Sequence, residues 1–428
     1  MIEKELIHQL NAPEKTLRLD AIKGLKTLVD NGQIPYPEQS RDVNNHVHTT
    51  YSFSPYSPTK AVWMGFIAGL RTIGIMDHDT VCGAEEFIEA AKIVGIAATV
   101  GVETRVKMDK TPLSGKTINN PDQDSIAYVA IHGIPHTQLS IFREYFKPYN
   151  RKRNERNRKM VDNINKIVSD FGISIDFDKD VIPISMYHDG GSITERHLLY
   201  ALILKILDKY PKGEKLLNFV QNDMGIKITD KIKNYLLDEN NPYYEYDLLG
   251  ALKSSMVSRF YIDADEECPD VFEFMDLAHR TNSILAYAYL GDITQSVTGD
   301  KKAQKFEDDY IEKLFDILKD IGFRAVTYMP SRNQIIQLRE IRARCEKDQF
   351  FQISGEDINT PRQNFICMAQ RDPEFDNLYD AAWALIGHET AATKDLDNAL
   401  FSDKIMKKIP KLNDRIEYFK KIVLKEKK

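Results

Sequence analysis

The sequence predicts an α/β fold built around a largely parallel sheet, and three observations support this. Between residues 42 and 106, short apolar segments alternate with amphipathic ones, which is the pattern of successive βαβ units. The same alternation returns between residues 283 and 353. Polar side chains follow directly after several of the apolar segments, at the sheet edge where parallel folds place their functional sites.

The composition is that of an ordinary folded protein. Of the 428 residues, 42% are hydrophobic and 29% are charged, and the formal net charge is −6. This charge gives no general attraction to nucleic acid or to an anionic membrane surface. The most apolar stretch, residues 61–70, is too short to span a bilayer. No secretory leader pattern is visible and the four cysteines form no CxxC pair, so we expect a reduced, cytoplasmic protein.

The first part of the chain is expected to be helical, followed by strands alternating with helices. Up to about residue 35, leucine and isoleucine recur at helical spacing, and Asp30-Asn31-Gly32 closes this segment with a turn. Strands are then predicted over 43–48, 72–76, 97–102 and 126–131, with helices over 60–68 and 84–94.

Residues 136 to 280 are mostly helical in character and highly charged, which we interpret as an α-helical insertion. Its basic run, residues 150–159, is interpreted as a solvated helix face, with reception of an anionic substrate as the alternative. Beyond the insertion, strands are predicted over 283–288, 325–328 and 350–353, with helices over 302–320 and 333–346 and a helical tail over 377–424. The expected segments are therefore an N-terminal extension (1–40), a first barrel part (41–135), the insertion (136–280), a second barrel part (281–370) and a C-terminal tail (371–428).

Side chains with metal-binding chemistry lie at the ends of the predicted strands. In His46-Val47-His48 the two imidazoles point to the same side, because side chains alternate along a strand. Two neutral imidazoles so placed suit a divalent transition metal. Glu103 follows the third strand and Asp357 the last, so the four side chains form a set of two nitrogen and two oxygen ligands.

At these motifs the sequence resembles the PHP (polymerase and histidinol phosphatase) superfamily of metal-dependent phosphoesterases. The family patterns HxHTxxSDG, TDHDT, GxE, AHP and GSDFH correspond to residues 46–53, 76–80, 101–103, 286–288 and 355–359, and the resemblance spans roughly residues 42 to 360. It implies a distorted (β/α)7 TIM-like barrel of the PHP type, with the α-helical insertion and helical N- and C-terminal extensions. Residues 193–198 look like the R-x-H segment of the phosphatase branch.

The departures from the family pattern imply a reduced metal site. By the resemblance, one metal uses His46, His48, Glu103 and Asp357, and all four are present. The positions needed for the other metals are altered and now hold Phe53, Tyr128, Tyr287 and Asn359. The resemblance therefore implies one divalent ion, zinc, manganese or iron, with an open position for water.

Two alternatives concern the lost ligands. His132 could replace the ligand lost at Tyr128, although an ungapped correspondence places Tyr128 at the family's position. Asp292 could replace the one lost at Tyr287, although helix capping is the more ordinary role of such an aspartate.

Two candidate catalytic residues follow the second strand. His78, which is no longer required as a ligand, is a candidate for protonating a leaving oxygen or holding the substrate. Asp77 is expected to orient or cap neighbouring groups rather than bind the metal directly.

Five residues are candidates for substrate binding. Arg196 and Arg332 are candidate phosphate clamps, because a guanidinium matches phosphate oxygens in a bidentate way. His197, in the segment that resembles R-x-H, is a further candidate phosphate contact. The rings of Tyr128 and Tyr287 are expected to shrink the pocket, and their hydroxyls to donate to a substrate oxygen.

The expected function is hydrolysis of a small phosphate ester, such as a nucleotide or sugar phosphate, by hydroxide generated at the metal. No membrane partner is expected, and nucleic acid only as short oligonucleotides. Gly-rich loops of the Walker or Rossmann pattern are absent, which argues against nucleotide-driven transfer and dinucleotide redox chemistry. Because several family ligands are lost, a catalytically inactive PHP-like protein that binds a metabolite or a protein partner is the alternative.

Overall fold

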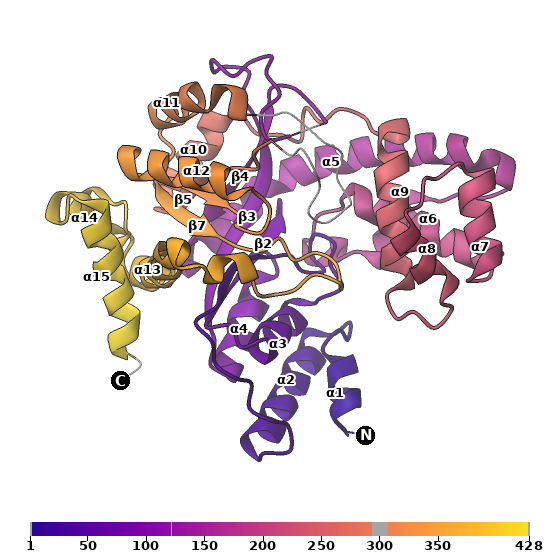
Figure 1. The fold of residues 1–428 in the computed structure, drawn as a ribbon, viewed down its shortest axis with the longest axis horizontal. Helices are drawn as coiled ribbons and strands as arrows, with labels where there is room; N and C mark the ends of the chain where they lie inside the picture. Colours follow the sequence, from indigo (N-terminus) through magenta and orange to yellow (C-terminus); the bar gives the residue numbers. More distant parts are fainter. Residues whose placement is uncertain (1, 121, 293–306, 427–428) are drawn as a thin grey trace.

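A single seven-stranded sheet follows chain order and nearly closes into a barrel (Figure 1). The structure, a computed structural model, describes residues 2–120, 122–292 and 307–426. Its strands are β1 (Val43–Val47), β2 (Thr72–His78), β3 (Ala97–Lys107), β4 (Ile126–His132), β5 (Ile284–Ala288), β6 (Ala325–Tyr328) and β7 (Phe351–Ser354). The architecture confirms the predicted α/β barrel.

The two ends of the sheet meet beside the first histidine pair. The backbone N–H of His48 donates to the carbonyl of Ile358 at 2.9 Å, and the N–H of Ile358 donates to the carbonyl of His46 at 3.1 Å. The side-chain amide of Asn45 also donates to the carbonyl of Ser354 at 2.8 Å. These bonds bring the segment after β7 against β1, although the two are more than 300 residues apart in the sequence.

Strand β4 runs opposite to its two neighbours, whereas the remaining pairs are parallel. The reason lies in the connection from β3 to β4, residues 108–125, whose described residues form no helix. A parallel neighbour needs a crossover that returns the chain to the same end of the sheet, whereas an antiparallel one can follow a loop directly. The simple β/α alternation expected from the sequence is therefore broken at this strand.

Helices α3 (Pro58–Ile67) and α4 (Ala84–Val94) cover the first part of the sheet, and α1 (Ile2–Gln9) and α2 (Lys15–Asp30) lie outside them (Figure 1). The N-terminal segment, predicted to be helical, consists of two helices. A buried ion pair fixes α2 on α4, since Arg18 lies 2.5 Å from Glu86, and both side chains are almost fully buried. Ser57 caps α3 by accepting from the N–H of Lys60, and Pro58 supplies the first helical residue.

Helices α5 (Leu139–Val168), α6 (Glu195–Lys209), α7 (Glu214–Asn218), α8 (Asp230–Leu237) and α9 (Tyr244–Phe260) form a body beside the sheet (Figure 1). Most of their buried apolar side chains make a hydrophobic cluster distinct from that of the sheet, whereas Leu139, Phe142 and Phe146 at the start of α5 pack in the cluster of the sheet. Helix α10 (Val271–Arg280) falls within the expected insertion range, but its side chains Val271, Phe274 and Leu277 pack in the core of the barrel.

The basic run 150–159 is not simply a solvated helix face, and that interpretation is wrong for one side of α5. Arg153 and Arg156 are buried, whereas Arg151, Arg158 and Lys159 are exposed. Residues three and four apart share a helix face, so Arg153, Arg156 and the buried Met160 look inward together. Two of the five basic side chains named here therefore lie inside the protein.

The second half of the sheet is covered by α11 (Ile311–Ile321), α12 (Ile335–Asp348) and α13 (Asp376–Lys394), and the chain ends with α14 (Asp403–Lys408) and α15 (Leu412–Glu426). The predicted C-terminal tail is thus three helices, of which α13 packs against β7. Among the described helices, none has both the length and the apolar character needed to cross a membrane.

Candidate active site

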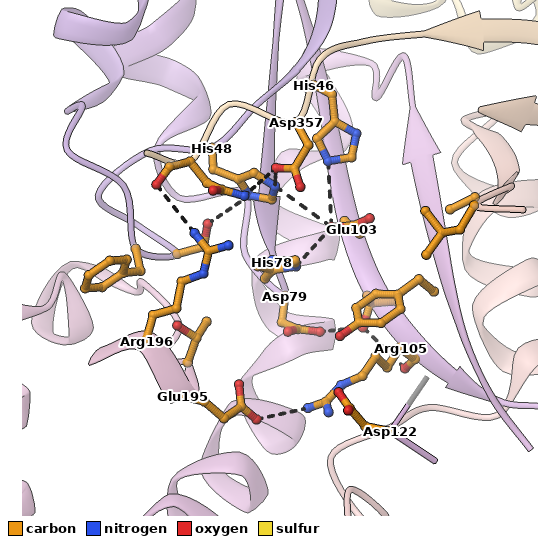
Figure 2. A pocket seen from close by; sticks show the side chains of 18 of the residues that line it. His46, His48, His78, Asp79, Glu103, Arg105, Asp122, Glu195, Arg196 and Asp357 are labelled. Carbon is orange, nitrogen blue, oxygen red and sulfur yellow. Dashed lines mark hydrogen bonds and ion pairs between the residues drawn. The ribbon is translucent and has the colours of Figure 1, made fainter. Parts of the chain in front are cut away.

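Four predicted ligands converge at the C-terminal edge of the barrel (Figure 2). His46 lies on β1 and His48 just after it, so both imidazoles point to the interior side of the strand. Glu103 on β3 pairs in register with His78 at the end of β2. Asp357 follows β7, where the chain returns to β1.

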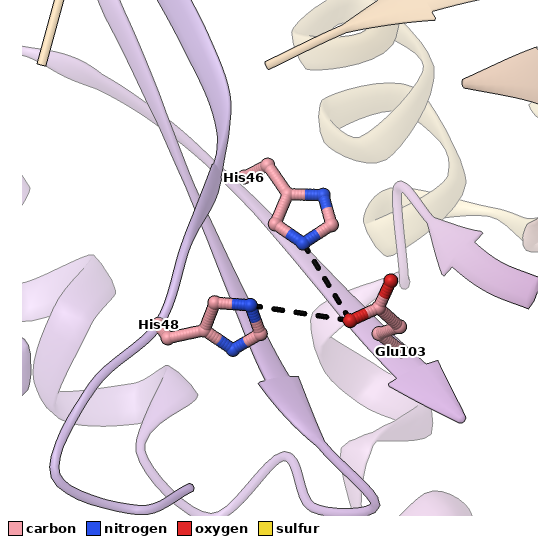
Figure 3. A group of neighbouring side chains, drawn as sticks. All are labelled: His46, His48 and Glu103. Atoms are coloured by element: carbon pink, nitrogen blue, oxygen red, sulfur yellow. Dashed lines mark ion pairs between the residues drawn. The ribbon is translucent and has the colours of Figure 1, made fainter. Parts of the chain in front are cut away.

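The carboxylate of Glu103 lies at the centre of the group. Its Oε2 is 3.7 Å from Nε2 of His46, 3.9 Å from Nε2 of His48 and 3.2 Å from Nδ1 of His78 (Figure 3 shows the first two). Oδ1 of Asp357 lies 3.1 Å from Nε2 of His48. His46, His48 and Glu103 each offer a ligand atom within 4.8 Å of the others.

The tautomer of His48 is set by Asp77 acting through Ser52, a residue that the sequence analysis did not single out. The buried carboxylate of Asp77 accepts from the N–H and hydroxyl of Thr49, at 2.7 and 2.6 Å, and from the hydroxyl of Ser52 at 2.6 Å. The hydroxyl of Ser52 donates its only proton to Asp77. The Ser52 oxygen therefore accepts a hydrogen bond from Nδ1 of His48, 3.3 Å away. Nε2 of His48 then carries the lone pair, which a metal ligand requires.

These residues fit a divalent cation. The Nε2 atoms of His46 and His48 are buried and have no hydrogen-bond partner, because the nearby carboxylates lie outside hydrogen-bond geometry. Burial alone would raise the pKa of Glu103, but the imidazoles of His46, His78 and His48 lower it to about 2. Two imidazole nitrogens facing ionised carboxylates form a donor set that suits zinc, manganese or iron.

His78 and Asp357 complete the polar edge of the group. Burial, followed by the neighbouring His48, lowers the pKa of His78 to about 3. Burial would raise the pKa of Asp357, but His48, His46 and Arg196 hold it well below its ordinary value. Asp357 is thus an anion beside the two histidines.

A cavity of about 250 Å³ opens beside this group, between the barrel edge and the helical body. Of the residues predicted for the site, those that line the cavity are His46, His48, His78, Glu103, Tyr128, Arg196, Arg332 and Asp357. Arg196 Nη1 lies 3.5 Å from the carbonyl of Asn359, and Arg332 Nε donates to the carbonyl of Leu290 at 3.1 Å.

Three predicted residues do not line this cavity. Asp77 faces the loop after β1, as described above. His197 is buried at the start of α6, where Nδ1 accepts from the N–H of Thr194 at 3.0 Å and the ring packs edge-on against Phe53. The hydroxyl of Tyr287 donates to Glu307.

The two proposed replacement ligands also lie outside the group. Within the described residues, the cluster of ligand atoms includes neither His132 nor Asp292. His132 is buried on β4 without lining the cavity, and burial and His46 lower its pKa to about 3. Asp292 lies in the loop after β5, where its N–H donates to Asp308 at 3.0 Å.

Several charged residues of the cavity were missed by the sequence analysis. Arg105 follows Glu103 by two positions on β3, so it faces the same side. Arg153 comes from α5, where Arg156 follows it on the same helix face without lining the cavity, and Glu195 is the first residue of α6. Two features of the sequence could have indicated these positions: Arg105 lies two residues after Glu103 in a strand, and Arg153 and Arg156 are three residues apart in a helix.

Glu307 should make the stability of the protein depend on pH. Burial raises its pKa from 4.5 to about 7, although Gly291, Tyr287 and Leu290 donate hydrogen bonds to it. The folded protein keeps this proton to a higher pH than the unfolded chain. Stability contributed by Glu307 is therefore present in full below about pH 4.5 and decreases by about 3 kcal/mol as the pH rises through about 7.

We expect Glu307→Gln to flatten this decrease, because the amide has no proton to lose in that range. Urea unfolding between pH 5 and 8 measures the effect, with exposed Glu340→Gln as the matched control. A variant that keeps the wild-type pH dependence would contradict the assignment.

Comparison with known proteins places the chain in a family. Residues 44–324, more than half of the 428, match the model of the PHP domain family. A 58-residue stretch is 41% identical to a 5'-3' exoribonuclease of Haemophilus influenzae, and it covers 14% of this chain and 21% of that protein. The chain thus matches about a fifth of the length of this curated relative.

Solved structures show a similar fold at low sequence identity. A Bifidobacterium adolescentis protein, provisionally described as a metal-dependent phosphoesterase, is 16% identical with a TM-score of 0.50, over 78% of this chain and 94% of that one. An amidohydrolase of Chromobacterium violaceum, solved with sulfate and no metal, is 15% identical with a TM-score of 0.49, over 76% and 90% of the two chains. Together with the match to the family model, the barrel confirms the resemblance drawn from the sequence motifs: this chain is a member of the PHP domain family.

Proposed function

We propose that this protein hydrolyses small phosphate esters with one divalent metal ion held by His46, His48, Glu103 and Asp357. One observation supports the proposal most directly. The buried Nε2 atoms of His46 and His48, which have no hydrogen-bond partner, lie close to the carboxylates of Glu103 and Asp357 in the wall of a cavity. Membership of the PHP family supports it, as does the likeness to proteins described as a metal-dependent phosphoesterase and an exoribonuclease.

Three residues that differ from the PHP family pattern favour a site for a single metal ion. The hydroxyl of Tyr287 is committed to Glu307, and Phe53 packs against His197, so neither position offers a ligand atom. The side-chain amide of Asn359 donates to Asp357 at 2.6 Å and so orients that carboxylate. When bound, a divalent ion supplies Lewis acidity and lowers the pKa of water toward neutrality.

The chain's own residues would hold the phosphate ester against this centre. Arg196 at the start of α6 and Arg332 after β6 both line the cavity, and their planar guanidinium groups match phosphate oxygens. Tyr128 lines the same cavity and presents a hydroxyl donor. His78, 3.2 Å from Glu103, would orient that carboxylate and contact the substrate.

The test is turnover of an aryl phosphate by the protein loaded with zinc, manganese or iron. We expect hydrolysis with at least one of these metals, and a loss of at least about 100-fold in kcat/KM in Asp357→Ala, on the order of 3 kcal/mol in transition-state stabilisation. The control is Asp178→Ala, whose carboxylate is 58% exposed and pairs with Arg158. Its kcat/KM should stay within about twofold of wild type, because exposed ion pairs contribute little.

Two results would count against the proposal. Undiminished turnover in Asp357→Ala would remove this carboxylate from the mechanism. Absence of turnover with all three metals would favour the alternative, a catalytically inactive PHP-like protein that binds a metabolite or a protein partner.

A further inference from the structure

The cavity extends from the metal-ligand group to a second end lined by charged side chains. Figure 2 shows Glu195, Arg105 and Asp122 at this end, opposite His46 and Asp357, with Asp79 between them. We call this end the charged arm and define it by the lining residues Asp79, Arg105, Asp122, Arg153, Glu195 and Lys253. A substrate whose phosphate sits at the metal group would place its remaining part in this direction.

The arginines of the charged arm already have carboxylate partners. Arg153 lies 2.6 Å from Asp79. Behind the wall, Arg156 lies 2.8 Å from Glu195 and 2.5 Å from Glu267. Each of these contacts joins oppositely charged groups, so the guanidinium charges are compensated within the protein.

Arg105 completes the network. Its Nη2 lies 3.4 Å from Glu267 and 3.9 Å from Glu195, and its Nη1 donates to the hydroxyl of Tyr261 at 2.8 Å. Three guanidinium groups therefore face three carboxylates, those of Asp79, Glu195 and Glu267. The remaining charges of the wall, Lys253 and Asp122, are also of opposite sign.

Glu195 is the most exposed of the three carboxylates in the network, and it lines the cavity. Its side chain is 24% exposed, whereas those of Asp79 and Glu267 are each 3% exposed. Burial would raise its pKa, but Arg156, Arg105 and Arg153 hold the pKa far below its ordinary value. An anion in the charged arm would thus face the negative charge of Glu195, which is more exposed than the guanidinium groups of Arg105 and Arg153 (24% against 6% each).

We propose that the charged arm receives an uncharged, hydroxyl- or amide-bearing part of the substrate and that Glu195 excludes a second phosphoryl group. The inference rests on the proposed phosphoesterase function and narrows its substrate class to monophosphates of neutral polar groups. Hydroxyl and amide groups can both donate to the exposed carboxylate and accept from neighbouring N–H groups, whereas a phosphate dianion can only accept. Glu195 is in this sense a specificity-determining residue.

The primary test is calorimetric titration of the metal-loaded protein with inorganic phosphate. Wild type is expected to bind at most one phosphate per chain, at the metal centre. Glu195→Gln keeps the shape of the side chain, removes its charge and leaves Arg156 and Arg105 with an uncompensated positive charge. This variant should bind one phosphate more than wild type.

The matched control is Glu266→Gln, because Glu266 also pairs with a basic residue of α5, Lys152 at 2.9 Å, but is 68% exposed. It should bind phosphate as wild type does. Two phosphates bound by wild type, or no gain in Glu195→Gln, would overturn the inference. If Glu195→Gln does not fold by circular dichroism, Glu195→Ala takes its place, with the same gain of one phosphate expected.

A kinetic measurement separates this inference from the proposed function. Turnover of aryl phosphate by the wild-type protein tests the proposed function alone, because this substrate carries no second anion for the charged arm to exclude. Phosphate stoichiometry is measured without turnover, so a protein that hydrolyses nothing but gains a phosphate site in Glu195→Gln refutes the function and supports the charged arm. If the protein hydrolyses aryl phosphate but Glu195→Gln gains no phosphate site, only the inference about the charged arm is refuted.

Discussion

Removal of His46 and Glu103 together is expected to reduce the metal content of the purified protein to background. The double variant His46→Ala, Glu103→Gln keeps only His48 and Asp357 of the proposed ligands. Loss of an outer partner of a metal ligand alone costs about 10- to 100-fold in affinity, so loss of two direct ligands should cost more than about a thousandfold. Elemental analysis after dialysis against zinc or manganese measures this, and aryl phosphate turnover should fall with it.

The control replaces a histidine and a glutamate of the same types elsewhere. His279 and Glu144 are exposed on helices away from the cavity. His279→Ala, Glu144→Gln should retain both metal and activity. Stoichiometric metal in the His46→Ala, Glu103→Gln variant would show that the cation is held by other groups, and the proposed centre would be wrong.

The parts of this site that the sequence predicts are those that depend on local geometry. His46 and His48 share a side because of the two-residue period of a strand. Glu103 lies near them because β3 runs parallel beside β2, although β3 continues to Lys107 and does not end at residue 102 as predicted. The family motifs then add Asp357, whose approach to His48 depends on closure of the sheet between β7 and β1.

The parts that the sequence does not predict depend on packing between distant segments. The basic run of α5 has the same composition whether it faces solvent or protein, and only the position of the helix against the barrel turns Arg153 toward Asp79. His197 and Tyr287 carry groups that could bind a substrate. In the structure, Nδ1 of His197 instead accepts a hydrogen bond from Thr194, and the hydroxyl of Tyr287 donates one to Glu307. Tertiary contacts determine which partners these side chains bind, and these contacts cannot be inferred from a pattern in one sequence.

Replacing Arg153 is expected to cause a large loss of stability, because it leaves a buried charge without its partner. Arg153 and Asp79 are 2.6 Å apart, with side chains 6% and 3% exposed. Removing one partner of a buried ion pair typically costs about 3–5 kcal/mol. Arg153→Met, which keeps much of the apolar stem, should therefore shift the urea unfolding transition strongly. Arg158 of the same helix, which forms an exposed pair with Asp178, offers the control. Arg158→Met should cost less than about 1 kcal/mol.

The cause of the loss can be isolated with a second change at Asp79. If the unpaired carboxylate is responsible, Asp79→Asn in the Arg153→Met background should recover much of the stability, because no charge then remains buried there. If instead the packing of the Arg153 stem matters most, the double variant should be at least as unstable as the single one. Asp79 also has a left-handed backbone (φ 53°) directly after His78, and Asn150 of α5 donates to its carbonyl at 2.9 Å. The ion pair therefore joins the helical insertion to the turn that presents His78 to Glu103, so Arg153→Met should lower aryl phosphate turnover even under conditions where the variant remains folded.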